Sequence, residues 1–241
     1  MYHNWEGVPQ ILGSNVRYDN VTIWVCPTAD SICDVDMSEL TADSAIVNSL
    51  LERLTYYVDH SDGHALIGFP PLGNPGDTLA KICGYGNLLP ELLTDTDAVL
   101  AAERALLETW KKLYDKVYAV LMRHNGGTCS WLPTWYPGRS VLLEFDLAAL
   151  ISPELFKKYL PYLIERAAYA DRCIYHLDGA DALRHLDTIL SIKEVDAISG
   201  SPGSHARISA NGCLSCRRFR LREKVFMFRK PVTLRNRSLI W

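Results

Sequence analysis

No apolar run of the roughly 18 residues needed to cross a bilayer occurs in the 241 residues of this chain, so we expect no membrane-spanning helix. Residues 1–7 lack the basic start and apolar core of a signal peptide, so we expect no secretory leader. The seven cysteines are odd in number, and several lie in apolar runs, where free cysteine behaves as a small hydrophobic residue. Together these features predict a protein of the reducing cytoplasm.

Two familiar motifs are present only as fragments. The lone pair Cys213-x-x-Cys216 has no second pair, so we do not expect a structural zinc site there. Gly84-Tyr85-Gly86 lacks a third glycine and follows no convincing strand, which argues against dinucleotide binding. The sequence also has no repeat of fixed period, so it does not predict a solenoid or a propeller.

Acidic residues are nearly missing from the last part of the chain. Residues 204–241 hold ten Lys and Arg but one acid, Glu223, whereas residues 1–203 hold 15 basic and 27 acidic residues. We therefore predict a boundary at 203/204, with one large domain over 1–203 and an atypical basic tail over 204–241. The alternation of basic and apolar residues in 217–222 is compatible with a nucleic-acid-binding arm.

We favour another origin for this tail, because a low-acid, Arg- and Ser-rich segment is what a frame shift in the coding sequence would produce. Nucleic acid is then not expected as a partner. A segment of this origin would be irregular or poorly docked. Deleting it would then change the free energy of unfolding by no more than about 0.5 kcal/mol.

The whole chain is 48% hydrophobic, as expected of a globular protein. Residues 1–203 have the apolar patterning of an α/β protein. The expected strands are 20–26, 141–145, 172–177 and 195–198, with a further apolar run at 64–69. The expected helices are 41–58, 97–125, one that begins at Ser152, and one over 182–190. The expected core contains Ile67, Leu106, Trp110, Val117, Leu142, Leu163, Ile174, Leu186 and Ile198.

The segment Arg172–Gly179 is the most informative stretch, because a buried apolar run ends abruptly in His176, Asp178 and a glycine. Ligands of α/β sheets and barrels lie at the carboxyl ends of parallel strands. Residues 141–199 have the pattern β-α-β-α-β, and such units are parallel, with these ends on one side. We therefore expect Asp146 to converge with His176 and Asp178. Period-two alternation predicts that His176 and Asp178 point to the same side.

A set of short motifs resembles the uroporphyrinogen decarboxylase superfamily over roughly residues 20–203. The motifs are Thr22-Ile-Trp, Gly68-Phe-Pro-Pro-Leu-Gly, Asp77-Thr-Leu-Ala, Gly86-Asn-Leu-Leu, Trp110, Gly126-Gly-Thr-Cys-Ser-Trp131, Glu144-Phe-Asp146, Leu150-Ile-Ser-Pro-Glu-Leu-Phe156, Tyr175-His-Leu-Asp-Gly179, His185-Leu-Asp187, Asp196-Ala-Ile198 and Pro202-Gly203. The resemblance implies a partial (β/α)8 TIM barrel, and either decarboxylation of a porphyrinogen-like substrate or cobalamin-linked methyl transfer.

The chain departs from that family in three respects. It has no counterpart of the amino-terminal strands and the arginine-rich segment that grips porphyrinogen carboxylates, so it resembles a barrel truncated at its N-terminus. Ile82 stands where the decarboxylases place a tyrosine. The methyltransferases bind zinc with His-x-Cys and a distant Cys, whereas the matching triplet here is His176-Leu177-Asp178. The resemblance therefore supports the fold more strongly than the reaction.

From these patterns we predict His176, Asp178 and Asp146 as catalytic residues. The residues expected to contact substrate are Glu144, Tyr175, Trp131, Trp135 and Phe69. His176 could donate or accept a proton or bind zinc, and otherwise its ring would be satisfied by a backbone carbonyl. Asp146 and Asp178 could instead cap the helices that follow them. Trp131 and Trp135 could roof a flat ligand or simply pack within their loop.

Two hypotheses about function follow. The first is an enzyme for a small-molecule substrate, which needs no cofactor if it is a decarboxylase, and zinc with a corrinoid protein partner if it is a methyltransferase. The second is a non-catalytic barrel fragment with a basic tail. A barrel that lacks strands at both ends leaves unpaired sheet edges, which favour association, so a homo-oligomer is also expected.

Overall fold

A four-stranded parallel sheet carries the strand ends that the sequence singled out. In the computed structural model, which describes residues 5–20, 22–132, 134–200 and the backbone of 225–228, the order of this sheet is β5-β6-β7-β8. The strands are β5 (Ser140–Glu144), β6 (Arg172–Leu177), β7 (Ala197–Gly200) and β8 (Val225–Phe228), and all three pairings are parallel. The fold is thus α/β, as expected, and the sheet is open rather than closed into a barrel over the described residues.

Helices connect the strands of this sheet. They are α6 (Pro153–Ala167), α7 (Leu186–Ser191) and the short 3-10 helices η3 (Asp146–Leu150) and η4 (Asp181–His185). Ser152 caps α6 by accepting the Leu155 N–H at 3.3 Å, so this helix begins where the sequence predicted, and Pro153 occupies its first turn. The expected helix over 182–190 is divided between η4 and α7.

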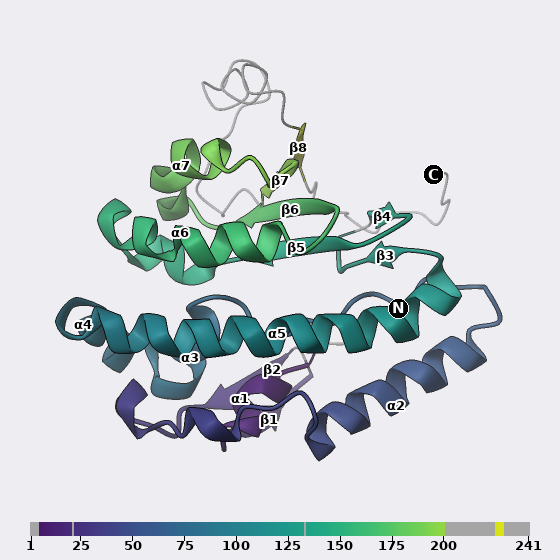
Figure 1. Cartoon of the computed structure of the whole chain (residues 1–241), viewed down its shortest axis with the longest axis horizontal. Helices are drawn as coiled ribbons and strands as arrows, with labels where there is room; N and C mark the ends of the chain where they lie inside the picture. Colours follow the sequence, from purple (N-terminus) through teal and green to yellow (C-terminus); the bar gives the residue numbers. More distant parts are fainter. Residues whose placement is uncertain (1–4, 21, 133, 201–224, 229–241) are drawn as a thin grey trace.

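The longest helix, α5 (Thr96–Asn125), crosses the middle of the molecule (Figure 1). Asp95 caps its first turn by accepting the Ala98 N–H, and Gly126 ends it in the left-handed conformation at φ +62°. Its buried stripe includes Leu106, Trp110 and Val117. This helix therefore begins and ends within one residue of its predicted bounds.

On one side of α5 lies the β5–β8 sheet with α6, and on the other lies the amino-terminal part of the chain (Figure 1). That part consists of α1 (Gly7–Ile11), β1 (Asn15–Tyr18), β2 (Ile23–Cys26), η1 (Ile32–Asp34), η2 (Met37–Glu39), α2 (Ala45–His60), α3 (Asp77–Cys83) and α4 (Tyr85–Thr94). The expected strand over 20–26 is β2, which pairs with β1 as an antiparallel hairpin. One continuous apolar core runs from Trp5 to Ile198.

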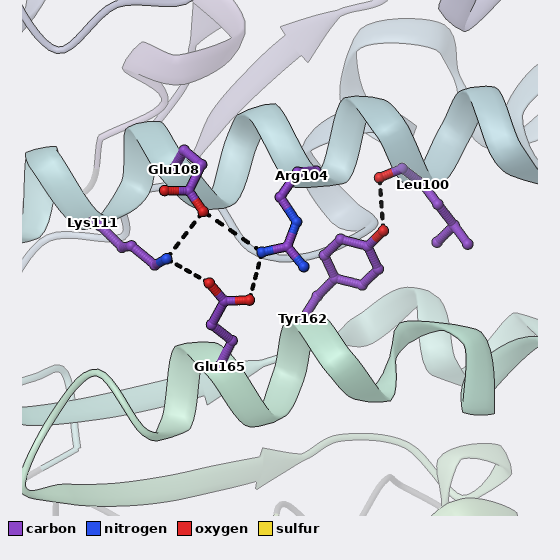
Figure 2. Close-up of polar contacts among 6 residues, drawn as sticks. All are labelled: Leu100, Arg104, Glu108, Lys111, Tyr162 and Glu165. Carbon is purple, nitrogen blue, oxygen red and sulfur yellow. Dashed lines mark hydrogen bonds and ion pairs between the residues drawn. The ribbon is translucent and has the colours of Figure 1, made fainter.

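Polar contacts join α5 to α6 along their exposed sides (Figure 2). Glu165 on α6 accepts from Arg104 and Lys111 on α5, each at 2.5 Å. The hydroxyl of Tyr162 donates to the carbonyl of Leu100 at 3.0 Å. Because these ion pairs face solvent, they contribute less to the attachment of α6 than its buried apolar face does.

The core prediction is correct except at Leu142 and Ile174. Ile67, Leu163 and Ile198 are buried as expected, whereas Leu142 and Ile174 are only half-buried. Alternation places Leu142 and Ile174 together on the face of the sheet opposite Leu143 and Tyr175, which lie in the core. The error arose because periodicity does not show which face of a strand the helices cover.

Two further segments differ from expectation. The apolar run at 64–69 forms no regular strand; the side chain of Asn125 instead satisfies the backbone N–H and carbonyl of Ile67, at 3.1 and 2.8 Å. Within the basic tail, Val225–Phe228 pairs with β7. The prediction of an irregular tail is therefore wrong for these four residues. The rest of the tail, 204–224 and 229–241, lies outside the described residues, as do Cys213 and Cys216.

Candidate active site at the carboxyl ends of the parallel strands

Three polar side chains form a row across neighbouring strands. Glu144 on β5 is the register partner of His176 on β6, and His176 is the partner of Ser199 on β7. Register partners of parallel strands project from the same face of a sheet. The row therefore lies across one face near the carboxyl ends of β5, β6 and β7.

Glu144 is held in place by two donors. The indole N–H of Trp131 donates to its Oε1, and the amide Nδ2 of Asn74 donates to Oε2 at 2.9 Å. Trp131 follows β3 (Thr128–Cys129), and Asn74 lies in the Gly- and Pro-rich loop before α3. Both oxygens are engaged, so Glu144 presents an oriented carboxylate at the site.

His176 is 8% exposed, and its ring meets the ring of Trp131 edge to face, with 4.9 Å between centroids. Its buried Nδ1 has no hydrogen-bond partner among the described residues. The alternative of a ring satisfied by a backbone carbonyl is therefore not met at Nδ1. His176 therefore holds a hydrogen-bonding group that the described residues leave unused.

Asp146 lies at the start of η3, directly after β5. Partial burial, with the neighbouring carboxylates of Glu144 and Asp178, raises the pKa of Asp146, and the charges of His176 and Lys81 oppose this shift. Asp146 is therefore subject to the charges of Glu144, His176 and Asp178, and the convergence of Asp146, His176 and Asp178 in one site stays a prediction.

Asp178 lies beyond the end of β6, which stops at Leu177. The strand alternation on which its predicted direction rested therefore does not extend to Asp178. Its side chain is exposed, and Oδ1 accepts the N–H of Gly179 at 2.9 Å. It caps no helix, because no side-chain cap is found at η4. Asp178 therefore contributes negative charge at the rim of the site.

Asp77 positions Asp146 from a distant part of the chain. The carboxylate of Asp77 is buried and accepts the backbone N–H of Asp146 at 2.9 Å and that of Leu147 at 2.7 Å. Burial, followed by the charge of Asp146, raises the pKa of Asp77 to about 7. Asp77 therefore anchors the turn between β5 and η3.

Three residues that were expected to contact substrate, Tyr175, Trp135 and Phe69, are not part of the row of Glu144, His176 and Ser199. Tyr175 is 1% exposed on the core face of the sheet, opposite His176, so the structure does not bring it to the site. Trp135, on β4 (Trp135–Tyr136), is 47% exposed and donates to the carbonyl of Asn125 at 3.1 Å, so it does not join Trp131 as a roof. Phe69 stacks on Tyr114, with 4.7 Å between centroids.

Phe69 also lines a small cavity of about 50 Å³ beside β5. Its polar lining includes Asn74, Ser130, Glu144 and the buried Arg166 of α6. The cavity therefore extends from the acidic row toward the layer of α5 and α6. Among the described residues, no group of three or more His, Cys, Asp or Glu is arranged to hold a metal ion.

The sequence did not identify Asn74, Asp77, Arg166 or Ser199 as parts of the site. Asn74 and Asp77 lie in a loop whose composition predicts only a turn. Ser199 follows a short apolar run, as His176 does. This similarity was the one signal in the sequence that could have identified Ser199 as part of the site. Arg166 lies on a helix, and arginines on helices are mostly exposed, so its sequence position gave no sign of burial.

The search against models of known protein families found no match, and no curated protein sequence matches the chain. In the part of the chain that the structure describes, no helix is both long enough and apolar enough to cross a membrane. Cys26, Cys33, Cys83, Cys129 and Cys173 are free thiols.

Proposed function

We propose that this chain is a small-molecule enzyme of the uroporphyrinogen decarboxylase type, which decarboxylates a porphyrinogen-like nitrogen heterocycle at the carboxyl ends of β5, β6 and β7. The observation that carries the proposal is the register pair of Glu144 and His176 at that edge, with Asp146 subject to the charges of Glu144, His176 and Asp178. Free thiols at all five described cysteines favour a reducing, cytoplasmic setting.

A partial (β/α)8 barrel is the architecture proposed for this enzyme. Besides the parallel order of β5 to β8, two contacts extend the arrangement on the other side. The N–H of Phe69 donates to the carbonyl of Cys129 at 2.7 Å, and the hydroxyls of Thr128 and Ser140 are 2.6 Å apart. These two contacts place the 64–69 segment beside β3 and β3 beside β5, although β3 pairs with β4 as a separate antiparallel sheet.

The carboxylates suit a reaction in which positive charge develops on the substrate. Loss of CO₂ from a pyrrole side chain is favoured when the ring is protonated, and a fixed carboxylate stabilises that cation. Glu144 is already oriented by Trp131 and Asn74, and Asp146 is held by the anchored turn. Glu144 therefore needs little rearrangement as charge develops, whereas for Asp146 the turn fixes the backbone position.

His176 is the proposed proton carrier. Its Nδ1 has no partner, and the edge-to-face contact with Trp131 holds the ring in one orientation. General acid–base catalysis by a positioned imidazole typically raises the rate of a proton-transfer step by about 10²–10⁴-fold. It can protonate the carbon from which CO₂ has left.

The test is turnover of a reduced porphyrinogen under anaerobic conditions, measured as CO₂ release and by chromatography of the oxidised products. We expect His176→Ala and Asp146→Asn each to lower kcat by about 10²-fold or more. His64→Ala is the matched control, because His64 is exposed and does not line the cavity. Equal turnover by His176→Ala and His64→Ala would contradict the role of His176.

Two outcomes would replace the proposal. Stoichiometric zinc in the purified protein that is lost in His176→Ala would favour methyl transfer, with a corrinoid protein as partner, since zinc holds a thiolate in that chemistry. Uniformly fast hydrogen exchange through residues 141–199 would favour a non-catalytic fragment. Strong protection there is expected, because the core is continuous across this unit.

A further inference from the structure

Arg166 is a buried cation with too few acceptors. It is 4% exposed, its Nη1 donates to the carbonyl of Gly73 at 2.6 Å, and its Nε has no partner among the described residues. A guanidinium has five N–H donors, and leaving them unpaired away from water costs free energy. The surroundings of Arg166 therefore lack an acceptor that this side chain needs.

The nearest carboxyl groups do not supply that acceptor. Glu103 and Asp77 interact with Arg166 through their charges, but neither forms an ion pair with it. Glu103 accepts the N–H of Gly76 at 2.5 Å, and Asp77 accepts two backbone N–H groups. Burial raises the pKa of Glu103 to about 8, so near neutral pH this group carries little negative charge.

The orientation of Arg166 leaves one edge of the guanidinium free. The indole of Trp110 covers a face of the group, with 4.5 Å from Cζ to the ring centroid, and Gly73 occupies Nη1. The edge formed by Nε and Nη2 remains, and this is an edge to which a carboxylate can bind with both oxygens.

The side chain of Arg166 lies beside the cavity next to β5. Trp110 and Arg166 both line it, and Gly73 falls between two further lining residues, Leu72 and Asn74. The volume of about 50 Å³ accommodates a group of a few atoms. Glu144 lines the cavity too, but its oxygens already accept from Trp131 and Asn74.

We propose that this cavity binds one carboxylate group through the Nε–Nη2 edge of Arg166. The carboxylate belongs either to a small free acid or to a larger ligand held at the strand ends. The test of this site does not depend on the proposed decarboxylation, because carboxylate binding can be measured without turnover.

The experiment is a titration of the full-length protein with sodium formate, followed by NMR of the arginine Nε–H groups, with sodium chloride at equal ionic strength as reference. Arg166→Lys assigns the Arg166 signal. We expect a saturable shift of this signal with formate and none with chloride. An equal, unsaturated response to both salts would overturn the proposal.

Thermal unfolding gives a second measurement. Formate should raise the Tm of the wild-type protein saturably, and Arg166→Lys should weaken the apparent affinity by about tenfold, since lysine keeps the charge but loses the two-pronged donor. Arg172→Lys, at an exposed arginine, should match the wild type. Undiminished stabilisation of Arg166→Lys would count against the site.

The source of the carboxylate is decided by competition. If a polycarboxylated porphyrin displaces formate from Arg166, the group belongs to a larger ligand that reaches from the strand ends. If formate and porphyrin bind together, the occupant is a small free acid. Both results keep the carboxylate on Arg166, and failure of turnover with porphyrinogens would leave the formate titration unaffected.

Discussion

At the scale of single residues, Asp77 connects the stability of the fold to the geometry of the candidate active site. It is separated by 69 residues from Asp146, yet it accepts the N–H groups that begin η3. A carboxylate that accepts backbone N–H groups replaces the missing partners of a helical turn. The position of Asp146 therefore depends on Asp77.

We expect Asp77→Ala to lower the free energy of unfolding by about 2–4 kcal/mol, since two backbone N–H groups lose their acceptor in a largely buried setting. Urea unfolding measures this change. Asp97→Ala is the control, because Asp97 is an exposed acid in the first turn of α5. If both variants lose the same small amount, Asp77 does not anchor the turn.

Glu103 predicts a pH dependence of stability. Its pKa is raised from an ordinary 4.5 to about 8 in the folded chain, mainly by burial. Between these values the unfolded chain releases the Glu103 proton while the folded chain retains it, so stability falls as pH rises from about 4.5 to about 8. Asp77, with its pKa raised to about 7, acts in the same direction.

Glu103→Gln should flatten this dependence, because glutamine keeps an acceptor for the N–H of Gly76 and cannot ionise. We expect the wild-type protein to lose on the order of 1 kcal/mol or more between pH 5 and pH 8 relative to the variant. The measurement is urea unfolding at both pH values. Parallel stability curves for the two proteins would show that Glu103 does not titrate in this range.

At the scale of elements, two glycines with positive φ have different roles. Gly126 ends α5 at φ +62°, and an added Cβ there would meet no atom within 4 Å. Gly76 precedes α3 at φ +66°, and its Cβ would lie 2.6 Å from Leu147 and 2.7 Å from Phe145. Gly76 thus allows the loop before α3 to approach the end of β5 closely.

Gly76→Ala should therefore destabilise the protein more than Gly126→Ala does. The cost at Gly126 is that of left-handed backbone alone, about 1 kcal/mol, whereas Gly76→Ala adds a clash with packed side chains, for a total of about 3 kcal/mol or more. Thermal unfolding compares the two variants. A similar Tm for both would mean that the turn after β5 can shift to accept the methyl group.

At the scale of the whole molecule, the pairing of β8 with β7 changes the expected effect of deleting the tail. A chain that ends at residue 203 loses β8 and leaves the backbone groups of one edge of β7 unpaired. Unpaired edges promote association, and their amides exchange faster. A chain that ends at Phe228 keeps β8 and serves as the matched control.

We expect the chain that ends at 203 to show faster hydrogen exchange at Ile198 and Gly200, and association that grows with concentration in gel filtration. The free energy of unfolding should fall by more than the 0.5 kcal/mol expected from an undocked segment. Equal exchange rates in the two truncated chains would restore the original expectation that the tail contributes nothing to the sheet.

The sequence by itself determined the elements whose signals are local. The bounds of α5 follow from its apolar stripe, Asp95 and Gly126, and the parallel pair β5 and β6 follows from apolar runs that alternate with helices. The handedness and direction of βαβ units also predict that Asp146 meets His176 and Asp178, and this stays a prediction.

Only the tertiary structure decided which groups complete the site. Tyr175 and His176 are adjacent in sequence, but the helices cover the face that carries Tyr175, and no pattern within the strand states which face that is. Asn74, Asp77 and Arg166 reach the end of β5 from other segments, and contacts across 70 residues leave no periodic trace in the sequence. Packing between layers, rather than local propensity, places them there, because burial of apolar faces selects which distant segments meet.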